Sequence, residues 1–88
     1  MATSNPTLTT SWAKIVDSGD EFTFGLQPGS VTVVAIAAVD TDTDPAVAGH
    51  FLMSPGESIN RALIGPGYVY AKVESGSTTQ GWLHAWTP

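Results

Sequence analysis

The sequence predicts an all-β domain, a small antiparallel sandwich or barrel of the jelly-roll type with about six to eight short strands. Short runs of β-forming residues alternate with turn residues from Trp12 onward, at the close spacing typical of sandwiches and barrels. No segment has convincing helical periodicity, and residues 59–64 allow a single helical turn at most. At 88 residues, folding hides roughly 63% of the surface of the extended chain, which suits one modest core and one domain.

The predicted turns depend on proline and glycine. Proline presets φ at the second position of a turn, and the glycine after it takes the positive φ that a type II turn requires. Five stretches supply such residues: DSGDE, QPGS, SPGES, GPGY and ESGS. Five turns in so short a chain indicate strands of only a few residues each.

Residues 1–11 are mostly Thr, Ser, Asn and Pro, with a single leucine. This composition predicts an extended polar N-terminal arm that cannot bury itself alone and that latches onto a neighbour. Residues 12–88 are then the single β domain.

Two strands can be assigned by the faces of their side chains. EFTFGL has the alternation of a half-buried strand, with Phe22, Phe24 and Leu26 on one face. VTVVAIAAV is apolar on both faces, one of which carries Val34 and Ile36. Such a strand is central in its sheet, or another chain covers one of its sides.

The last two strand patterns are rich in aromatic residues. In YVYAKV, Tyr68 and Tyr70 lie on the face opposite to the valines, and in GWLHAWTP, Trp82, His84 and Trp86 lie opposite to a leucine. We expect the tryptophans and the histidine to form a surface that a partner covers.

The chain has three basic residues against eight acidic ones, for a net charge of −5. Nucleic-acid binding requires clustered Lys and Arg, and Lys14, Arg61 and Lys72 are scattered, so no nucleic-acid partner is expected. The charged fraction of 12% is about half that of a typical soluble domain. This favours a surface shared with neighbouring subunits, the alternative being a surface rich in Ser and Thr.

The chain has no cysteine, so it has no disulfide and no thiolate metal site, and it can fold in a reducing cytoplasm. Its opening residues lack the basic start and the apolar core of a signal peptide, and no apolar run approaches membrane-spanning length. No membrane partner is therefore expected.

His50 and Glu57 flank the Pro-Gly turn in GHFLMSPGESI and are the first candidates for metal ligands. The metal-binding cupin signature requires two histidines one residue apart, and Leu52 stands at the second position. His84 lies far along the chain, and one His with one Glu does not complete a site. We therefore expect no metal and no other cofactor, and interpret the stretch as a strand that ends in a turn, with Glu57 in solvent.

Asp40, Asp42 and Asp44 alternate in DTDTDP like the first ligands of a calcium loop. An EF-hand loop also requires Gly at its sixth position and Glu at its twelfth, where this chain has Pro45 and Phe51. We interpret the stretch as a charged loop with its tip in water, and a weak loop-type calcium site is the alternative.

No enzyme is predicted, because the chain has no Gly-x-Ser-x-Gly elbow, no ordered catalytic triad and little depth for a cleft. The aromatic residues are the better functional candidates, since Trp and Tyr can stack on sugar rings and dominate protein interfaces. Burial of one or two tryptophans in the core is the alternative. The candidate interface residues are Trp12, Val34, Ile36, Tyr68, Tyr70, Trp82, His84 and Trp86.

The order of several stretches resembles that of small structural proteins of tailed bacteriophages. Trp12-x-Lys14-Ile15 is followed by a Phe-rich strand, VTVVAIAA, an acidic loop with Pro45, GHFLMSPGESI, GPGYVYAKV and a C-terminal Trp strand. The likeness covers most of the chain from Trp12 onward, and Gly-His-x-Leu-x-x-Pro-Gly-Glu and Val-Tyr-Ala-Lys are its most recognisable pieces. These pieces are strand and turn devices, so the resemblance transfers no catalytic residue.

The resemblance implies a capsid decoration protein that binds the outer capsid surface as an oligomer, with a trimer favoured, and stabilises it. Its partners would be the major capsid protein or another virion protein, and its location the virion, after assembly in the host cytoplasm. A tail or fibre module is the alternative from the same setting. Independently of the resemblance, a carbohydrate-binding module with Trp82, Trp86 and Tyr70 as a stacking platform is a further alternative.

Overall fold

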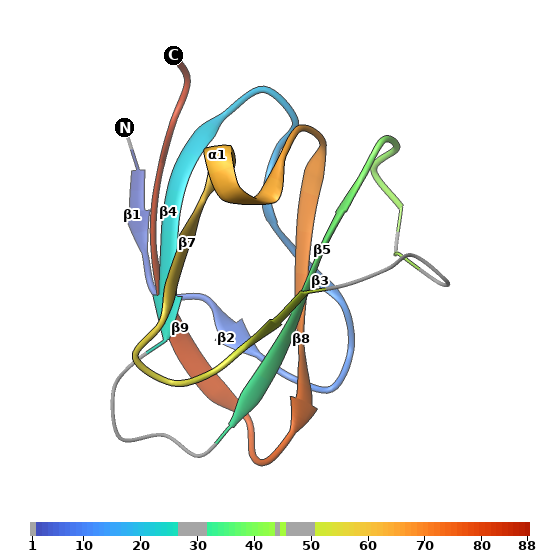
Figure 1. Ribbon diagram of the computed structural model, residues 1–88, viewed down its shortest axis with the longest axis vertical. Coiled ribbons are helices and arrows are strands. Elements are labelled where there is room, and N and C mark those ends of the chain that lie inside the picture. Colours follow the sequence, from blue (N-terminus) through green and yellow to red (C-terminus); the bar gives the residue numbers. More distant parts are fainter. Residues whose placement is uncertain (1, 27–31, 44, 46–50) are drawn as a thin grey trace.

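The computed structural model describes residues 2–26, 32–43, 45 and 51–88 and shows two antiparallel sheets packed face to face (Figure 1). The strands of the first sheet are β1 (Ala2–Ser4), β2 (Thr7–Leu8), β4 (Glu21–Leu26), β7 (Ser58–Asn60) and β9 (Thr79–Trp86). The strands of the second sheet are β3 (Ala13–Val16), β5 (Val33–Val39), β6 (Phe51–Met53) and β8 (Tyr68–Ser75). One short helix, α1 (Arg61–Ile64), follows β7.

The strand order identifies the sandwich as a jelly roll. The first sheet runs β1-β9-β4-β7 and the second β3-β8-β5-β6. β1 and β2 pair in succession with β9, so together they act as one interrupted strand and each sheet has four positions. Consecutive strands lie in different sheets except at the step from β5 to β6, as in a double-sheet jelly roll. The predicted fold class is confirmed.

Apolar side chains from both sheets fill the space between them. The burial of Phe22, Phe24 and Leu26 on β4 confirms the alternation seen in EFTFGL. The buried cluster consists of Leu8, Val16, Phe22, Phe24, Leu26, Val34, Ile36, Met53, Ile59, Val69, Ala71, Val73 and Leu83. The three tryptophans of the chain are half-buried and lie outside this cluster, so the alternative that one or two of them fill the core is wrong.

The N-terminal residues belong to the first sheet because β1 and β2 pair with β9, so the prediction of an extended polar arm outside the β domain is wrong. Leu8 is completely buried. The carbonyl oxygen of Thr9 accepts a hydrogen bond from the backbone N–H of Val73 at 2.6 Å, and that of Pro6 accepts one from Gly81 at 3.1 Å. Backbone pairing needs no apolar side chain, and an edge strand can expose polar residues. The polar composition therefore concealed a strand.

Arg61 holds two turns together at one end of the sandwich. Its guanidinium donates hydrogen bonds to the carbonyl oxygens of Asp17 (2.9 Å) and Asp20 (2.9 Å), between β3 and β4. It also donates to those of Gly65 (3.1 Å) and Gly67 (2.7 Å), between α1 and β8. A planar fork with five N–H donors can serve four acceptors at once. Carbonyl partners leave no signal in a sequence, so this role was not predicted.

The turn after β6 has the geometry that its Pro-Gly pair predicts. Gly56 has a φ of 85°, and the N–H of Glu57 donates to the carbonyl oxygen of Ser54 at 3.1 Å. Glu57 is exposed to solvent, as predicted. Its carboxylate also accepts a hydrogen bond from the N–H of Ser54 and so closes the turn. Asn60 caps α1 by accepting a hydrogen bond from the N–H of Leu63 at 2.9 Å, and α1 lies within residues 59–64, where the sequence allows one helical turn at most.

Candidate functional site

Trp82, His84 and Trp86 project from β9 onto the outer face of the first sheet. They alternate with Leu83, which is buried in the core, and each is half-buried. The predicted alternation of this strand is therefore confirmed, and the three rings form a row along one strand.

The other aromatic candidates lie on the second sheet, on the opposite side of the sandwich. Tyr68 and Tyr70 alternate on β8 with Val69, which is in the core. Trp12 packs against the same strand, with the Nζ of Lys72 5.0 Å from the centroid of its ring. The prediction of a stacking platform that combines Tyr70 with the tryptophans of β9 is therefore wrong.

The strand register arranges the outer face of the first sheet in rows of side chains. Neighbouring strands are about 5 Å apart and alternate residues of one strand about 7 Å apart, so a small ligand can contact two rows. The rows, from β9 across β4 to β7, are Trp82, Gly25 and Ser58; His84, Thr23 and Asn60; Trp86 and Glu21. We call this surface of eight residues the β9 platform.

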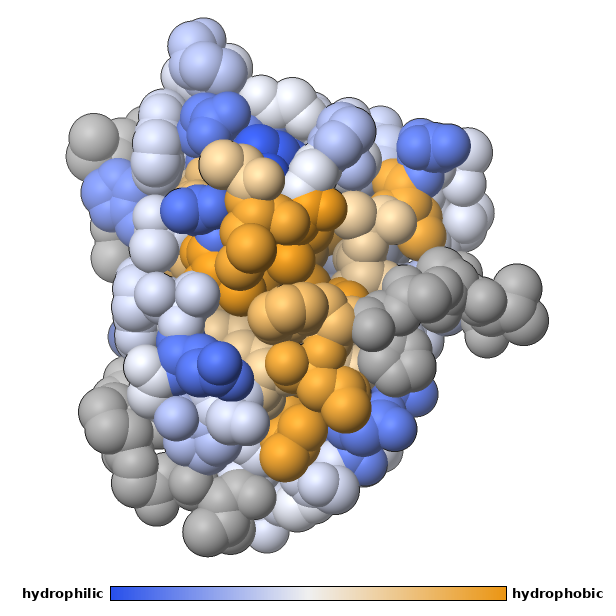
Figure 2. Space-filling view, viewed as in Figure 1, coloured by the Kyte–Doolittle hydropathy of each residue, from blue (hydrophilic) through white to orange (hydrophobic). Residues whose placement is uncertain are grey.

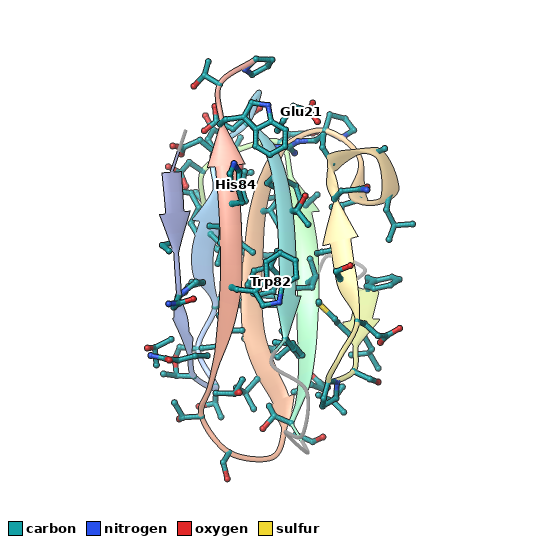
Figure 3. All side chains as sticks on the ribbon, turned by 90° about the vertical axis from the view of Figure 1, so that its left-hand side faces the viewer. Glu21, Trp82 and His84 are labelled. Carbon is teal, nitrogen blue, oxygen red and sulfur yellow. The ribbon has the colours of Figure 1, made fainter. Side chains whose placement is uncertain are left out.

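The indole of Trp82 lies over Gly25. A Cβ atom at position 25 would come within 2.5 Å of the Cε2 and 2.7 Å of the Nε1 of this indole, so only glycine leaves room for the ring. Figure 3 shows the ring reaching from β9 across β4 with its broad face turned outward, and His84 and Glu21 further along the same side. Gly25 thus allows a flat and partly exposed aromatic surface.

His84 and Trp86 continue the β9 platform away from Trp82. Their ring centroids are 5.3 Å apart at an interplanar angle of 75°, which is the edge-to-face geometry that aromatic rings favour. The remaining groups on the platform are hydroxyls, an amide and the carboxylate of Glu21, and none of its eight residues is Lys or Arg. The surface is suited to binding by stacking and hydrogen bonding.

The outer face of the second sheet is occupied by a charged network. The Nζ of Lys14 lies 2.8 Å from Asp42 Oδ2 and 2.8 Å from Asp17 Oδ1, and the hydroxyl of Tyr70 donates to Asp42 Oδ1 at 2.6 Å. A hydrogen bond with Asp17, and a smaller effect of the one with Asp42, raise the pKa of Lys14 above its usual value. A hydrogen bond from Lys14, and a smaller effect of the one from Tyr70, lower the pKa of Asp42 below the ordinary value of 3.8. Both oxygens of Asp42 are thus engaged with its own sheet.

This network predicts a pH-dependent contribution of Asp42 to stability. Because its pKa is lowered on folding, the contribution is present above about pH 3.8 and is lost as the pH falls through the folded pKa. Lys14 has a raised pKa and stays charged over this range, so the window belongs to the carboxylate. Asp42→Asn should lower the urea midpoint at about pH 6 and change it little at about pH 2.

Asp40→Asn is the matched control, because it removes an acidic charge from the same exposed loop. It should shift the urea midpoint less than Asp42→Asn at pH 6. An equal loss of stability for Asp42→Asn at both pH values would contradict the assigned network.

The described residues do not bring the metal candidates together. His50 and Asp44 lie outside the described residues. Among the residues that are described, no three His, Asp or Glu side chains form a group that could hold a metal ion. The carboxylate of Glu57 closes its own turn, and that of Asp42 pairs with Lys14 and Tyr70.

Val34 and Ile36 were predicted as interface residues, but they are 0% and 1% exposed and belong to the core. β5 is flanked by β8 and β6, and Ala35 and Ala37, on its other face, are also buried within this chain. The strand is therefore apolar on both sides because it is central, and these two candidates are wrong. Tyr70 is also buried, with only its hydroxyl reaching Asp42.

Three large apolar side chains that were not candidates are exposed: Phe51 (42%), Leu52 (52%) and Leu63 (60%). They lie on β6 and α1. Figure 2 shows an apolar area on the face of the molecule that carries these two elements. We call these three residues the edge patch. A signal for it was present in the run Phe51-Leu52-Met53, because a strand with one face on the core buries only every second residue.

Comparisons with protein-family models, with curated proteins and with solved structures returned no match for this chain. In the part of the chain that the structure describes, no helix is long and apolar enough to cross a membrane. Fold and surface together define a small jelly-roll domain with an aromatic platform on one sheet and an apolar patch at its open edge.

Proposed function

We propose that the chain is a virion structural protein, a decoration protein that assembles as an oligomer on the outer surface of a phage capsid. The observation that carries this proposal is the edge patch. Two further features support it: the chain resembles small structural proteins of tailed phages from Trp12 onward, and its charged fraction of 12% is low for a surface that faces only water.

The edge patch lies where both sheets end. β6 is an edge strand of the second sheet and β7 an edge strand of the first. Figure 1 shows both strands on the side that faces the viewer. Monomeric β proteins usually protect such edges with charged residues, proline or a bulge. Neither strand carries a charged residue or proline, and Phe51 and Leu52 expose about half of their surface. An unprotected apolar edge favours association with another chain.

Further copies of this chain are the occupants that we assign to the edge patch. The sequence favoured assembly through the N-terminal residues or through the tryptophan face of β9. The N-terminal residues are committed to the first sheet, and polar residues share the rows of the tryptophan face. Copies that meet around a symmetry axis would cover their edge patches together and leave the outer sheet faces accessible. A trimer is the favoured assembly.

Leu52→Glu should convert the oligomer into a monomer. The side chain is half-exposed, so the charge costs little in the isolated fold, but it would be buried without a partner in the assembly. Light scattering on the purified protein measures this directly: the wild type should have the mass of three chains, and the variant that of one.

Thr78→Glu is the control, since it adds the same charge at an exposed position outside the edge patch. It should assemble like the wild type. A wild-type monomer at micromolar concentration, or an oligomer that Leu52→Glu leaves intact, would contradict assembly through the edge patch.

The decoration role itself is tested on purified virions. Mass spectrometry should find the chain in many copies per particle, and cryo-electron microscopy should place its density at repeated positions on the outer capsid. A few copies confined to the tail would point to the tail or fibre module, and absence from the particle would overturn the proposal.

A further inference from the structure

The β9 platform is a second surface, chemically different from the edge patch. It contains no exposed aliphatic side chain, and hydroxyl, amide and carboxylate groups lie in the same rows as its aromatic rings. A protein interface of ordinary size has a contiguous apolar centre, and on the described surface the large exposed apolar side chains are those of the edge patch. The platform therefore fits a ligand that is apolar on its flat faces and polar at its rim.

The charge distribution narrows the class of ligand. The chain has a net charge of −5, and its three basic residues are engaged elsewhere: Lys14 with two aspartates, Arg61 with four carbonyl oxygens, and Lys72 with the ring of Trp12. Among the eight residues of the β9 platform, Glu21 is the charged one, so a phosphate or sulfate group would be repelled there. An uncharged ligand is favoured.

We propose that the β9 platform binds a neutral oligosaccharide, with the indole of Trp82 as the stacking surface for a pyranose ring. The face of an indole is electron-rich and attracts the weakly positive C–H groups on the flat side of a sugar. The hydroxyl and carboxylate groups of Ser58, Thr23 and Glu21 lie within one or two rows of the indole and can hydrogen-bond sugar hydroxyls. This inference is independent of the proposed function, because it concerns a different surface.

The length of the row suggests a ligand larger than one sugar. The Cα atoms of Trp82 and Trp86 are separated by four residues of an extended strand, or about 13 Å. An oligosaccharide that lies along β9 would contact both indoles and His84 between them. A monosaccharide would contact Trp82 alone and bind more weakly.

Titration of the wild-type protein with neutral tetrasaccharides tests the proposal. The probes are cellotetraose, maltotetraose and chitotetraose, with a sulfated tetrasaccharide as the charged counter-probe. The three indole N–H signals in a two-dimensional NMR spectrum report on the three tryptophans, and single Trp→Phe variants assign them. At least one neutral probe should shift the signal of Trp82 while the signal of Trp12 stays in place, and the sulfated probe should shift neither.

Two variants locate the site. Trp82→Ala should weaken binding by at least about tenfold, the loss expected when one stacked ring is removed. Gly25→Ala keeps the indole but places a Cβ where the ring lies, so it should weaken binding while leaving all three tryptophans in the chain. Trp12→Ala is the matched control, because it removes an indole from the opposite sheet and should bind like the wild type. Circular dichroism checks that each variant is folded.

The outcomes separate clearly. A saturable shift of Trp82 with a neutral probe, lost or weakened in Trp82→Ala or Gly25→Ala and retained in Trp12→Ala, supports the site. No shift of any indole with millimolar neutral probes, preference for the sulfated probe, or an equal loss in Trp12→Ala overturns it. If Trp82→Ala is unfolded, the wild-type titration alone decides.

Discussion

Deletion of residues 2–10 should leave the domain largely unfolded at room temperature. The deletion removes β1 and β2, which cover one edge of β9, and it empties the site of Leu8 in the core. Truncation of one buried leucine costs about 2–5 kcal/mol, and the whole stability of such a domain is about 5–15 kcal/mol. Loss of the strand pairing adds to that cost. Circular dichroism and a thermal unfolding scan would measure the result.

Two milder variants show which part of the segment matters. Deletion of residues 2–5 removes β1 but keeps Leu8, so this protein should fold with a lower Tm. Leu8→Ala keeps both strands and should lower Tm by roughly 10 °C or more. If the protein without residues 2–10 melts like the full chain, the N-terminal residues act as the extended arm outside the domain that their composition predicts.

Arg61→Ala should destabilise the domain by roughly 3 kcal/mol. The substitution leaves four carbonyl oxygens without their charged donor, and a hydrogen bond from a charged group contributes about 1.5–3 kcal/mol before the remaining acceptors regain water. Because the four acceptors belong to two separate turns, both turns should loosen together. Urea unfolding followed by tryptophan fluorescence measures the change in free energy.

Arg61→Lys separates geometry from charge. Lysine keeps the positive charge, but its single ammonium group cannot reach four carbonyl oxygens in two turns, so most of the loss should persist. Lys72→Ala is the control: it truncates another basic side chain, whose contact with Trp12 is worth about 0.5–1 kcal/mol. Wild-type stability in Arg61→Lys would show that charge alone accounts for the role of this residue.

The fold class could be predicted because it depends on local patterns. Alternation in EFTFGL and GWLHAWTP assigned the buried and exposed faces of β4 and β9 correctly, and the turn at Gly56 followed from the chemistry of its residues. The N-terminal strands were missed for a physical reason. Their contribution to the sheet comes from backbone hydrogen bonds and one leucine, and polar side chains do not distinguish such an edge strand from a flexible arm.

The candidate site was predicted only in part, because strand neighbours are set by the order of strands in each sheet. Tyr70 and Trp82 look equivalent in the sequence, yet they lie on opposite sheets. The position of Trp82 over Gly25 is a cross-strand contact that neither residue indicates alone. Val34 and Ile36 were assigned to an interface because a strand apolar on both faces is compatible with either a central position or a covering chain.

The pairing of β1 and β2 with β9 joins the first residues of the chain to the last strand. During synthesis, the first sheet cannot close until residues 79–86 have left the ribosome, so the domain cannot complete its core before β9 has been made. Contacts between such distant segments also make the search for the native topology slow. A chain whose synthesis stops before β9 would therefore have an incomplete first sheet and an exposed core, which makes it a target for chaperones and proteases.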